Sequence, residues 1–442
     1  MRLASSSRIS TVMPPRWRRL GPGPPTAPLP CRIRSDTRPG IHSGVGLQRR
    51  ALHLAPPFLL DDYFPRFLTL TEVEASKKRS RAYAHLSNCN LCPRLCGVNR
   101  FETTGMCLIG DTAKVNVIAP HFGEGNDLVA CCAIADEVAV ADMTQNHVSR
   151  DTTAVALMCN LRCSFCQNHD ISHQRNGMDL APEELAEWFL KLQQVGNVHN
   201  INLVTPEHVV PQVALALLHA RDAGLTLPII YNTSAFDSLA SLELLDGLVD
   251  IYLPDFKVWE PATSRRLLKA DDYAATARES IKAMHAQVGD LCFTGDGIAK
   301  RGVLVRHLVM PGLEEEGATI MRWLAKEVST DMFVNIMEQY HPDAHVGKPK
   351  RRRGKSSSGS SGSSGPLNAL GEEGTQGNED HGLDYAKLQH DTKGQNPAPE
   401  EVRYADINRA VNAHEMSTVR KAAEEAGLWR FCDPPKHGGF NI

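Results

Sequence analysis

The sequence predicts an α/β fold in which short, mostly parallel strands alternate with amphipathic helices. Between Thr153 and Met337, apolar and β-branched runs of strand length alternate with longer runs whose apolar residues recur at helical spacing. The strand candidates are almost continuously apolar, which is typical of a parallel sheet that is buried on both faces or curled into a barrel. The chain of 442 residues is long enough for one large domain of this kind with extensions at both ends.

Each strand candidate is followed by a helix candidate or a turn. The first helix candidate is the clearest, because Pro182 lies in its first turn beside Glu183 and Glu184, and Gly196 closes it. The expected strands are 153–158, 200–204, 228–232, 249–253, 302–309 and 332–337. The expected helices are 181–196, 208–224, 238–247, 271–289 and 317–329.

Unusual residues follow the expected strands. In parallel α/β sheets, ligands gather at the carboxyl ends of the strands, so we expect these side chains to share one edge. They are Cys159, Thr205, Pro206, Asn232, Thr233, Asp255, Lys257, Pro311, Gly312, Glu338 and Gln339.

The first fifty residues differ in composition from the rest of the chain. They contain ten arginines and a single acid, Asp36, together with many serines and prolines. This composition predicts an organelle-targeting, disordered segment over residues 1–60, for either a mitochondrion or a chloroplast. A disordered tail without an address is the alternative reading of the same composition.

A second low-complexity stretch separates the expected core domain, 150–345, from the end of the chain. Residues 346–399 open with the basic run "KPKRRRGK", continue through serine and glycine, and predict a disordered linker. Residues 400–432 have apolar residues at helical spacing, so we expect a C-terminal helical segment, a pair of helices docking on the core. The net charge of −3 argues against a general nucleic-acid binder, and no apolar run is long enough to span a membrane.

The stretch "LMCNLRCSFCQNHDIS" carries three closely spaced thiols, Cys159, Cys163 and Cys166. Clustered cysteines suit metal ligation in a reducing compartment better than a disulfide framework. A structural zinc ion needs four ligands, for which His169 is a candidate fourth. Three thiolates alone also suit a 4Fe–4S cluster in which the fourth iron stays open for a substrate.

These three cysteines, with Phe165 before the last, resemble the CxxxCxφC signature of the radical SAM superfamily. The stretches "INLVTPEHVVPQ", "YNTSAFDS", "VDIYLPDFK", "RGVLVRHLVMPG" and "VNIMEQY" resemble its pyruvate formate-lyase activating enzyme-like subfamily. The resemblance implies a partial (β/α)6 barrel. It also implies an oxidoreductase that cleaves S-adenosylmethionine (SAM) reductively to a 5′-deoxyadenosyl radical, with a ferredoxin or flavodoxin as electron donor and an unidentified substrate that could be a protein.

The resemblance also assigns roles to single residues. Cys159, Cys163 and Cys166 would hold the cluster and Phe165 would pack near the adenine. Thr205 stands where many members contact the SAM amino group, although a helix cap is an alternative. The other candidates for contacts to a cation or to SAM are Asn232, which replaces an acid of the family pattern, and Asp255, Lys257 and Arg306. Asp255 paired with Lys257 or Arg306 alone would satisfy the same sequence.

A second cysteine group lies upstream, within residues 80–115. "CNLCPRLCGVNRFETTGMC" places Cys89, Cys92, Cys96 and Cys107 at spacings that can close around one metal centre. Four thiolates in a turn-rich segment predict a structural zinc site or an auxiliary iron–sulfur cluster, and the ligands alone do not decide between them.

The approach to the three-cysteine motif departs from the family pattern over residues 125–158. Met158 stands where family members have a glycine. We expect Cys131 and Cys132 in this segment to be small buried hydrophobes. Two rival functions remain open from the sequence: a non-catalytic zinc-binding interaction protein, and an RNA-modifying radical SAM enzyme that uses the basic linker.

Overall fold

The structure is a computed structural model that describes residues 55–121, 152–157, 159–169, 172, 177–196, 198–350 and 401–432. All of these belong to one compact unit, Arg49–Ile442. Residues 1–54, most of the expected linker, Met158 and the cysteine pair at 131–132 lie outside the described residues. Among the described helices, none combines the length and the apolar character that crossing a bilayer requires.

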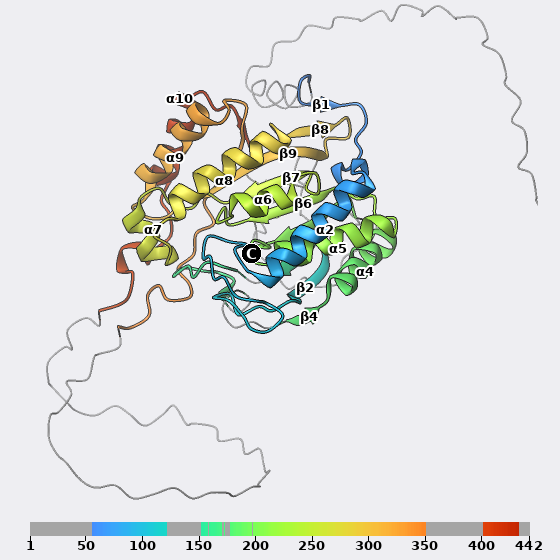
Figure 1. The fold of residues 1–442 in the computed structure, drawn as a ribbon. Helices are drawn as coiled ribbons and strands as arrows, with labels where there is room; N and C mark the ends of the chain where they lie inside the picture. The colour runs from blue at the N-terminus through green and yellow to red at the C-terminus, as the bar shows by residue number, and fades with distance from the viewer. Residues whose placement is uncertain are drawn as a thin grey trace, which may run out of the picture. The chain divides into compact units, whose positions relative to one another are not determined.

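A mixed sheet with a mostly parallel centre forms the middle of this unit (Figure 1). Its strands lie in the order β1-β8-β9-β7-β6-β5-β3-β2-β4, with β10 beside β9 and β11 beside β10. The parallel strands are β3 (Thr152–Leu157), β5 (Ile201–Val204), β6 (Ile229–Thr233), β7 (Ile251–Pro254), β9 (Ala299–Leu308), β10 (Phe333–Met337) and β11 (Arg430–Phe431). The first six of these confirm the six strands expected from the sequence.

The remaining strands border the parallel centre. β2 pairs antiparallel with β3 and β4, β8 pairs antiparallel with β9, and β1 pairs parallel with β8. Their bounds are β1 Leu59–Leu60, β2 Ala113–His121, β4 Met178–Leu180 and β8 Cys292–Thr294. Residues 59 and 60, assigned from the sequence to the targeting segment, therefore belong to the sheet.

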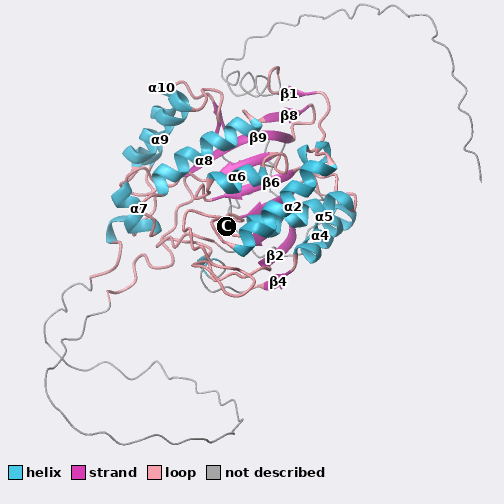
Figure 2. Cartoon of the chain, in the orientation of Figure 1, coloured by secondary structure: helices cyan, strands magenta, loops and turns pink. Residues whose placement is uncertain are grey.

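Helices α2, α5, α6 and α8 cross the front of the strands in the view of Figure 2. Several helices begin where the sequence provides a cap or a proline: Thr71 and Glu74 form a capping box at the start of α2, and Pro182 and Pro261 open α4 and α7. The helices are α2 (Glu72–Ser87), α4 (Pro182–Lys191, continued by a π turn, η3, Leu192–Gly196), α5 (Val210–Asp222), α6 (Leu239–Leu245), α7 (Pro261–Leu268), α8 (Tyr273–Val288), α9 (Glu314–Glu327) and α10 (Ala413–Glu425), with 3-10 turns η1 (Arg66–Thr69) and η4 (Ala405–Ile407).

Neighbouring residues of the central strands contribute to two different hydrophobic clusters. Tyr231 packs in the larger cluster, under the helices, whereas Ile230 packs in a smaller one with Leu253 and Phe333. Because successive side chains of a strand point to opposite faces, both faces of the sheet are covered here. This is the physical reason that the strands are apolar throughout, as the sequence analysis expected.

The C-terminal segment differs from the expected pair of helices. Tyr404 has a left-handed backbone conformation, φ 54°, and Asn412 caps a new helix, so only the single turn η4 fits between them. α10 then packs on α9 and the chain ends its described part in β11. The start of the expected linker is also ordered, because Lys350 N–H donates to the carbonyl of Glu401 at 3.1 Å.

Candidate functional site

The three-cysteine loop follows β3 and is held by backbone contacts to segments far away in the sequence. Ser164 N–H donates to the carbonyl of Leu267, at the end of α7, at 2.7 Å. The amide of Asn160 donates to the carbonyl of Phe236, after β6, at 3.0 Å. The carbonyl of Ser164 in turn accepts a bond from the backbone N–H of His345. The loop therefore lies at the carboxyl edge of the parallel strands, as expected.

The second half of the loop packs on the segment after β10. Phe165 is buried against Tyr340, with ring centroids 6.0 Å apart, and Gln167 donates to the carbonyl of Gln339 at 2.9 Å. His169, the candidate fourth ligand, makes an edge-on ring contact with His345 at 5.4 Å. Phe165 is thus a buried core aromatic, a position that does not conflict with the expected packing near an adenine.

All three thiols are free in this loop. Burial raises the pKa of Cys159 well above its usual value, and the carboxylate of Glu207 adds to the increase. Burial also raises the pKa of Cys163 to about 12, although the ammonium of Lys257 opposes it. Without a compensating cation, buried thiols of this kind stay protonated, so ligation would release their protons. Among the described residues, no three His, Cys, Asp or Glu side chains take positions around a single metal ion.

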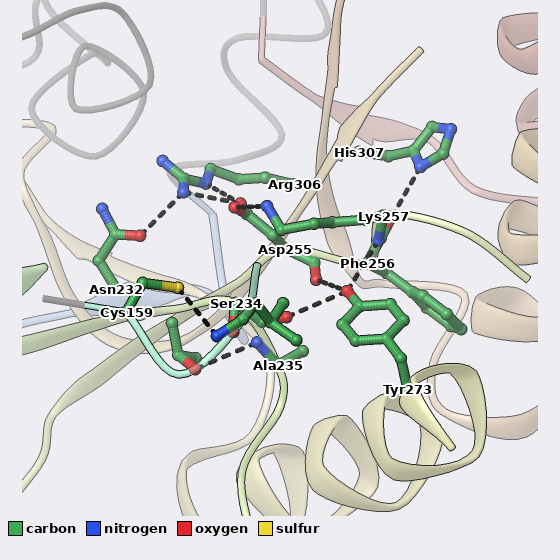
Figure 3. Close-up of polar contacts among 12 residues, drawn as sticks. Cys159, Asn232, Ser234, Ala235, Asp255, Phe256, Lys257, Tyr273, Arg306 and His307 are labelled. Atoms are coloured by element: carbon green, nitrogen blue, oxygen red, sulfur yellow. Dashed lines mark hydrogen bonds and ion pairs between the residues drawn. The ribbon is translucent and has the colours of Figure 1, made fainter. Parts of the chain in front are cut away.

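A charged cluster lies beside the loop, at the ends of β6, β7 and β9 (Figure 3). Arg306 Nε donates to Asp255 Oδ1 at 2.7 Å, and its Nη2 donates to Asn232 Oδ1 at 2.8 Å. Lys257 Nζ donates to the other carboxylate oxygen of Asp255 at 2.7 Å. Four of the residues proposed from the sequence therefore meet here, in the ion-paired arrangement considered as an alternative to ligand binding.

The cluster is largely buried, so its charges interact strongly. The side chains of Asp255, Lys257 and Arg306 are 17%, 19% and 10% exposed. Burial alone would raise the pKa of Asp255, but the two cations hold that pKa below its usual value. Two cations face one carboxylate, which leaves one positive charge beside Cys163.

The backbone under this cluster is fixed by Tyr273 from α8 (Figure 3). Its hydroxyl lies 2.6 Å from the carbonyl of Asp255 and 3.0 Å from that of Ser234, and it accepts the N–H of Lys257 at 2.9 Å. His307 Nδ1 lies 2.7 Å from the carbonyl of Phe256. These contacts position the Asp255–Lys257 turn.

Two buried acids that the sequence analysis did not single out, Glu207 and Asp237, lie near the end of β6. Glu207, in the quoted "TPEH" stretch, is fully buried and accepts the N–H of Ser234 at 2.5 Å. Burial raises the pKa of Glu207 and that of Asp237, which is bound by Tyr231 and Thr233. The sequence signal was weak, because Glu207 lies three residues after the end of β5 and a charged residue in a loop is ordinary until its burial is known.

Thr205 turns the chain toward Glu207. Its φ is 52°, its N–H donates to the carbonyl of Asn232 at 2.7 Å, and its hydroxyl bonds to the carbonyl of Val204. The N-cap residue of α5 is Val209, whose side chain makes no capping hydrogen bond, so the alternative that Thr205 caps this helix is wrong.

The second cysteine group forms a turn-rich segment between α2 and β2. The backbone N–H of Gly97 donates to the carbonyl of Cys89, and that of Cys89 to the carbonyl of Val98, so the segment folds back on itself. Arg94 links the two cysteine groups, because its Nε lies 3.3 Å from the carbonyl of Asn160 and its guanidinium stacks over Phe236.

The chain resembles an uncharacterized protein of Methanocaldococcus jannaschii, at 27% identity over 264 residues, which cover 58% of this chain and 67% of that protein. No family model matches the chain. Among solved structures, SuiB of Streptococcus suis aligns with 41% of this chain and 39% of its own, at 11% identity and a TM-score of 0.28.

Proposed function

We propose that this chain is a radical SAM enzyme whose 4Fe–4S cluster is held by Cys159, Cys163 and Cys166. The observation that carries the proposal is the position of three free thiols in one well-anchored loop at the carboxyl edge of a parallel sheet. With such a cluster bound, its open iron would bind SAM and supply the electron that cleaves SAM to methionine and a 5′-deoxyadenosyl radical.

The surroundings of the loop suit a zwitterionic amino-acid group. Glu207 lies within electrostatic reach of Cys159, and Lys257 within reach of Cys163. An ammonium would be attracted toward the buried carboxylate of Glu207. A carboxylate would be attracted toward the unbalanced positive charge of Lys257 and Arg306. The methionine part of SAM carries both groups.

Asn232 and Asp255 have a positioning role in this proposal. Each binds Arg306, so the guanidinium is held by two acceptors and presents a fixed charge at the site. Thr205 acts through the backbone, because its left-handed turn brings Glu207 back toward the strand ends. Phe165, wedged against Tyr340, fixes the peptide between Cys163 and Cys166.

The finer architecture that we propose is a partial (β/α)6 barrel formed by β3, β5, β6, β7, β9 and β10. These strands follow one another in the sheet in sequence order, as parallel β/α units with short crossovers do. A carbon radical reacts with most solvents and backbones, so its target hydrogen must be held in contact in a dry site. Phe236 and Tyr340, both buried beside the loop, would exclude water there.

The proposal includes partners and a place of action. Reductive cleavage needs a low-potential donor such as a ferredoxin or flavodoxin. The substrate is unidentified, with a protein as one candidate class. The arginine-rich N-terminal composition supports action in a mitochondrion or chloroplast.

Anaerobic reconstitution tests the proposal. The full chain would be incubated with iron and sulfide and then given SAM and dithionite. We expect brown protein with a 4Fe–4S absorption and formation of 5′-deoxyadenosine. Colourless zinc-bound protein that forms no 5′-deoxyadenosine would contradict the proposal and favour a non-catalytic zinc protein.

A further inference from the structure

We infer that Cys89, Cys92, Cys96 and Cys107 bind a second metal centre as four thiolates, and that Arg100 is a built-in cation that stabilises them. The site does not depend on the proposed function, because none of its residues belongs to the three-cysteine loop. The centre would be either a zinc ion or an iron–sulfur cluster, since both are held by thiolates. Among the described residues these four side chains, like those of the three-cysteine loop, do not take positions around a single ion, so binding would draw the sulfurs together.

Three of the four sulfur atoms have an N–H donor. Arg100 Nε lies 3.1 Å from Sγ of Cys89 and its Nη2 lies 3.3 Å from Sγ of Cys107. The backbone N–H of Met106 lies 3.3 Å from Sγ of Cys96. A neutral thiol is a weak acceptor, so donors on these three sulfurs fit thiolates.

The buried guanidinium of Arg100 is the strongest evidence that the four sulfurs carry negative charge. It is 2% exposed, and in the described part of the chain its Nη1 has no hydrogen-bond acceptor. A guanidinium in such a place is costly unless it is paired with an anion. The structure places no carboxylate in contact with Arg100 among the described residues; its guanidinium donates to two sulfurs instead. Thiolates on a metal provide the missing charge.

Two non-glycine residues beside the sulfurs have a left-handed backbone conformation, which is unusual. Leu95, directly before Cys96, has φ 45°, and Leu108, directly after Cys107, has φ 61°. Non-glycine residues in this region of backbone conformation are strained, and such residues cluster at ligand sites. Both leucines are exposed, so core packing does not explain them.

Gly105 shows how closely the segment packs around one sulfur. A Cβ built on Gly105 would lie 3.0 Å from Sγ and 3.2 Å from Cβ of Cys96. Substitution to alanine therefore moves the sulfur of Cys96 without removing a ligand or a hydrogen bond. This provides a test that leaves the chemistry of the segment intact.

The experiment uses the full chain with Cys159, Cys163 and Cys166 changed to alanine, so that the first group cannot contribute metal. Protein would be purified anaerobically, and zinc, iron and sulfide measured. We expect either one zinc, or iron and sulfide with a charge-transfer absorption. The first result would identify a zinc site and the second an iron–sulfur cluster. Cys92→Ala is expected to abolish this metal, whereas Cys292→Ala, a buried cysteine of β8, should retain it.

Arg100 is tested by the affinity of the metal and by its spectrum. With Co²⁺ as probe, we expect Arg100→Met and Gly105→Ala each to weaken binding about 10- to 100-fold and to alter the thiolate-to-cobalt absorption. Arg100→Lys, which keeps the charge, should restore part of the affinity. Circular dichroism would establish that each variant is folded.

Two results would overturn the inference. One is a folded parent protein without stoichiometric metal; the other is metal whose amount and spectrum are unchanged by Cys92→Ala. Unchanged cobalt affinity and spectrum in folded Arg100→Met would overturn the role of Arg100. Because the first cysteine group is absent throughout, a failure here does not bear on the proposed radical chemistry.

Discussion

Arg306 Nε lies 2.7 Å from Oδ1 of Asp255, and the two residues join the ends of β7 and β9 inside the candidate site. The backbone is coupled at the same place, because Phe256 N–H donates to the carbonyl of Arg306 at 2.9 Å. The pair is therefore both a charge in the site and a connection between neighbouring strands.

We predict that Arg306→Gln lowers the free energy of unfolding by about 3 kcal/mol, because among the described residues it leaves the buried Asp255 with Lys257 as its one remaining cation. Arg266→Gln is the control, since Arg266 makes a two-bond pair with Asp406 at the surface and should lose at most about 1 kcal/mol. Urea denaturation measures both. Equal losses would mean that burial of the Asp255 pair has no energetic effect.

Cys163→Ala is predicted to abolish assembly of the first cluster and formation of 5′-deoxyadenosine while the sheet stays folded. The reason is that the variant keeps only two of the three thiolates proposed to hold the cluster. Cys292→Ala should assemble the cluster and form product normally. Iron analysis and product chromatography measure the outcome, and normal product from Cys163→Ala would refute the ligand assignment.

Glu415 is predicted to make the docking of α10 dependent on pH. Hydrogen bonds from Arg409 first, then from the backbone N–H groups of Asn412 and Gly312, lower the pKa of Glu415 to about 2, from 4.5 in the unfolded chain. A lowered pKa stabilises the fold above pH 4.5, and this contribution is lost as the pH falls toward 2.

Glu415→Gln should therefore cost up to about 3 kcal/mol at pH 7 and progressively less between pH 4.5 and 2. Glu424→Gln on the same helix is the control, since Glu424 makes an exposed pair with Arg420. Thermal unfolding against pH measures both variants. A constant difference between wild type and Glu415→Gln over this range would contradict the prediction.

Gly317→Ala is predicted to destabilise the protein, opposite to the usual effect in a helix. Alanine normally stabilises a helix interior by about 1 kcal/mol over glycine. Here the new Cβ would lie 2.6 Å from Nε2 of His307 and 2.8 Å from Cγ2 of Val419. We expect a net loss of about 1 to 3 kcal/mol, measured by urea denaturation, because overpacking exceeds the gain in propensity. A stabilised variant would show that α10 can move away from α9.

The parallel centre of the sheet could be predicted because its signal is local. Each strand is a short apolar run with a helix after it, and burial on both faces keeps it apolar. The border strands could not be predicted in the same way. β1 and β11 contain two residues each, and their pairing depends on distant partners, such as Phe293 for Leu59 and Val334 for Phe431.

The candidate site was partly predictable for a related reason. The rule that ligands gather at the carboxyl ends of strands located Asn232, Asp255 and Lys257 correctly at one edge. It could not reveal that Arg306, from within β9, binds both Asn232 and Asp255, because the geometry of that contact depends on three different strands. Glu207 and Arg100 were missed because a single charged residue in a loop is ordinary until its burial is known.

The most direct measurement is the ⁵⁷Fe Mössbauer spectrum of a variant that keeps Cys159, Cys163 and Cys166 but has alanine at Cys89, Cys92, Cys96 and Cys107. The account predicts a 4Fe–4S cluster with one iron site that changes when SAM is added. Four iron sites that SAM leaves unchanged, or protein that binds no iron, would contradict it.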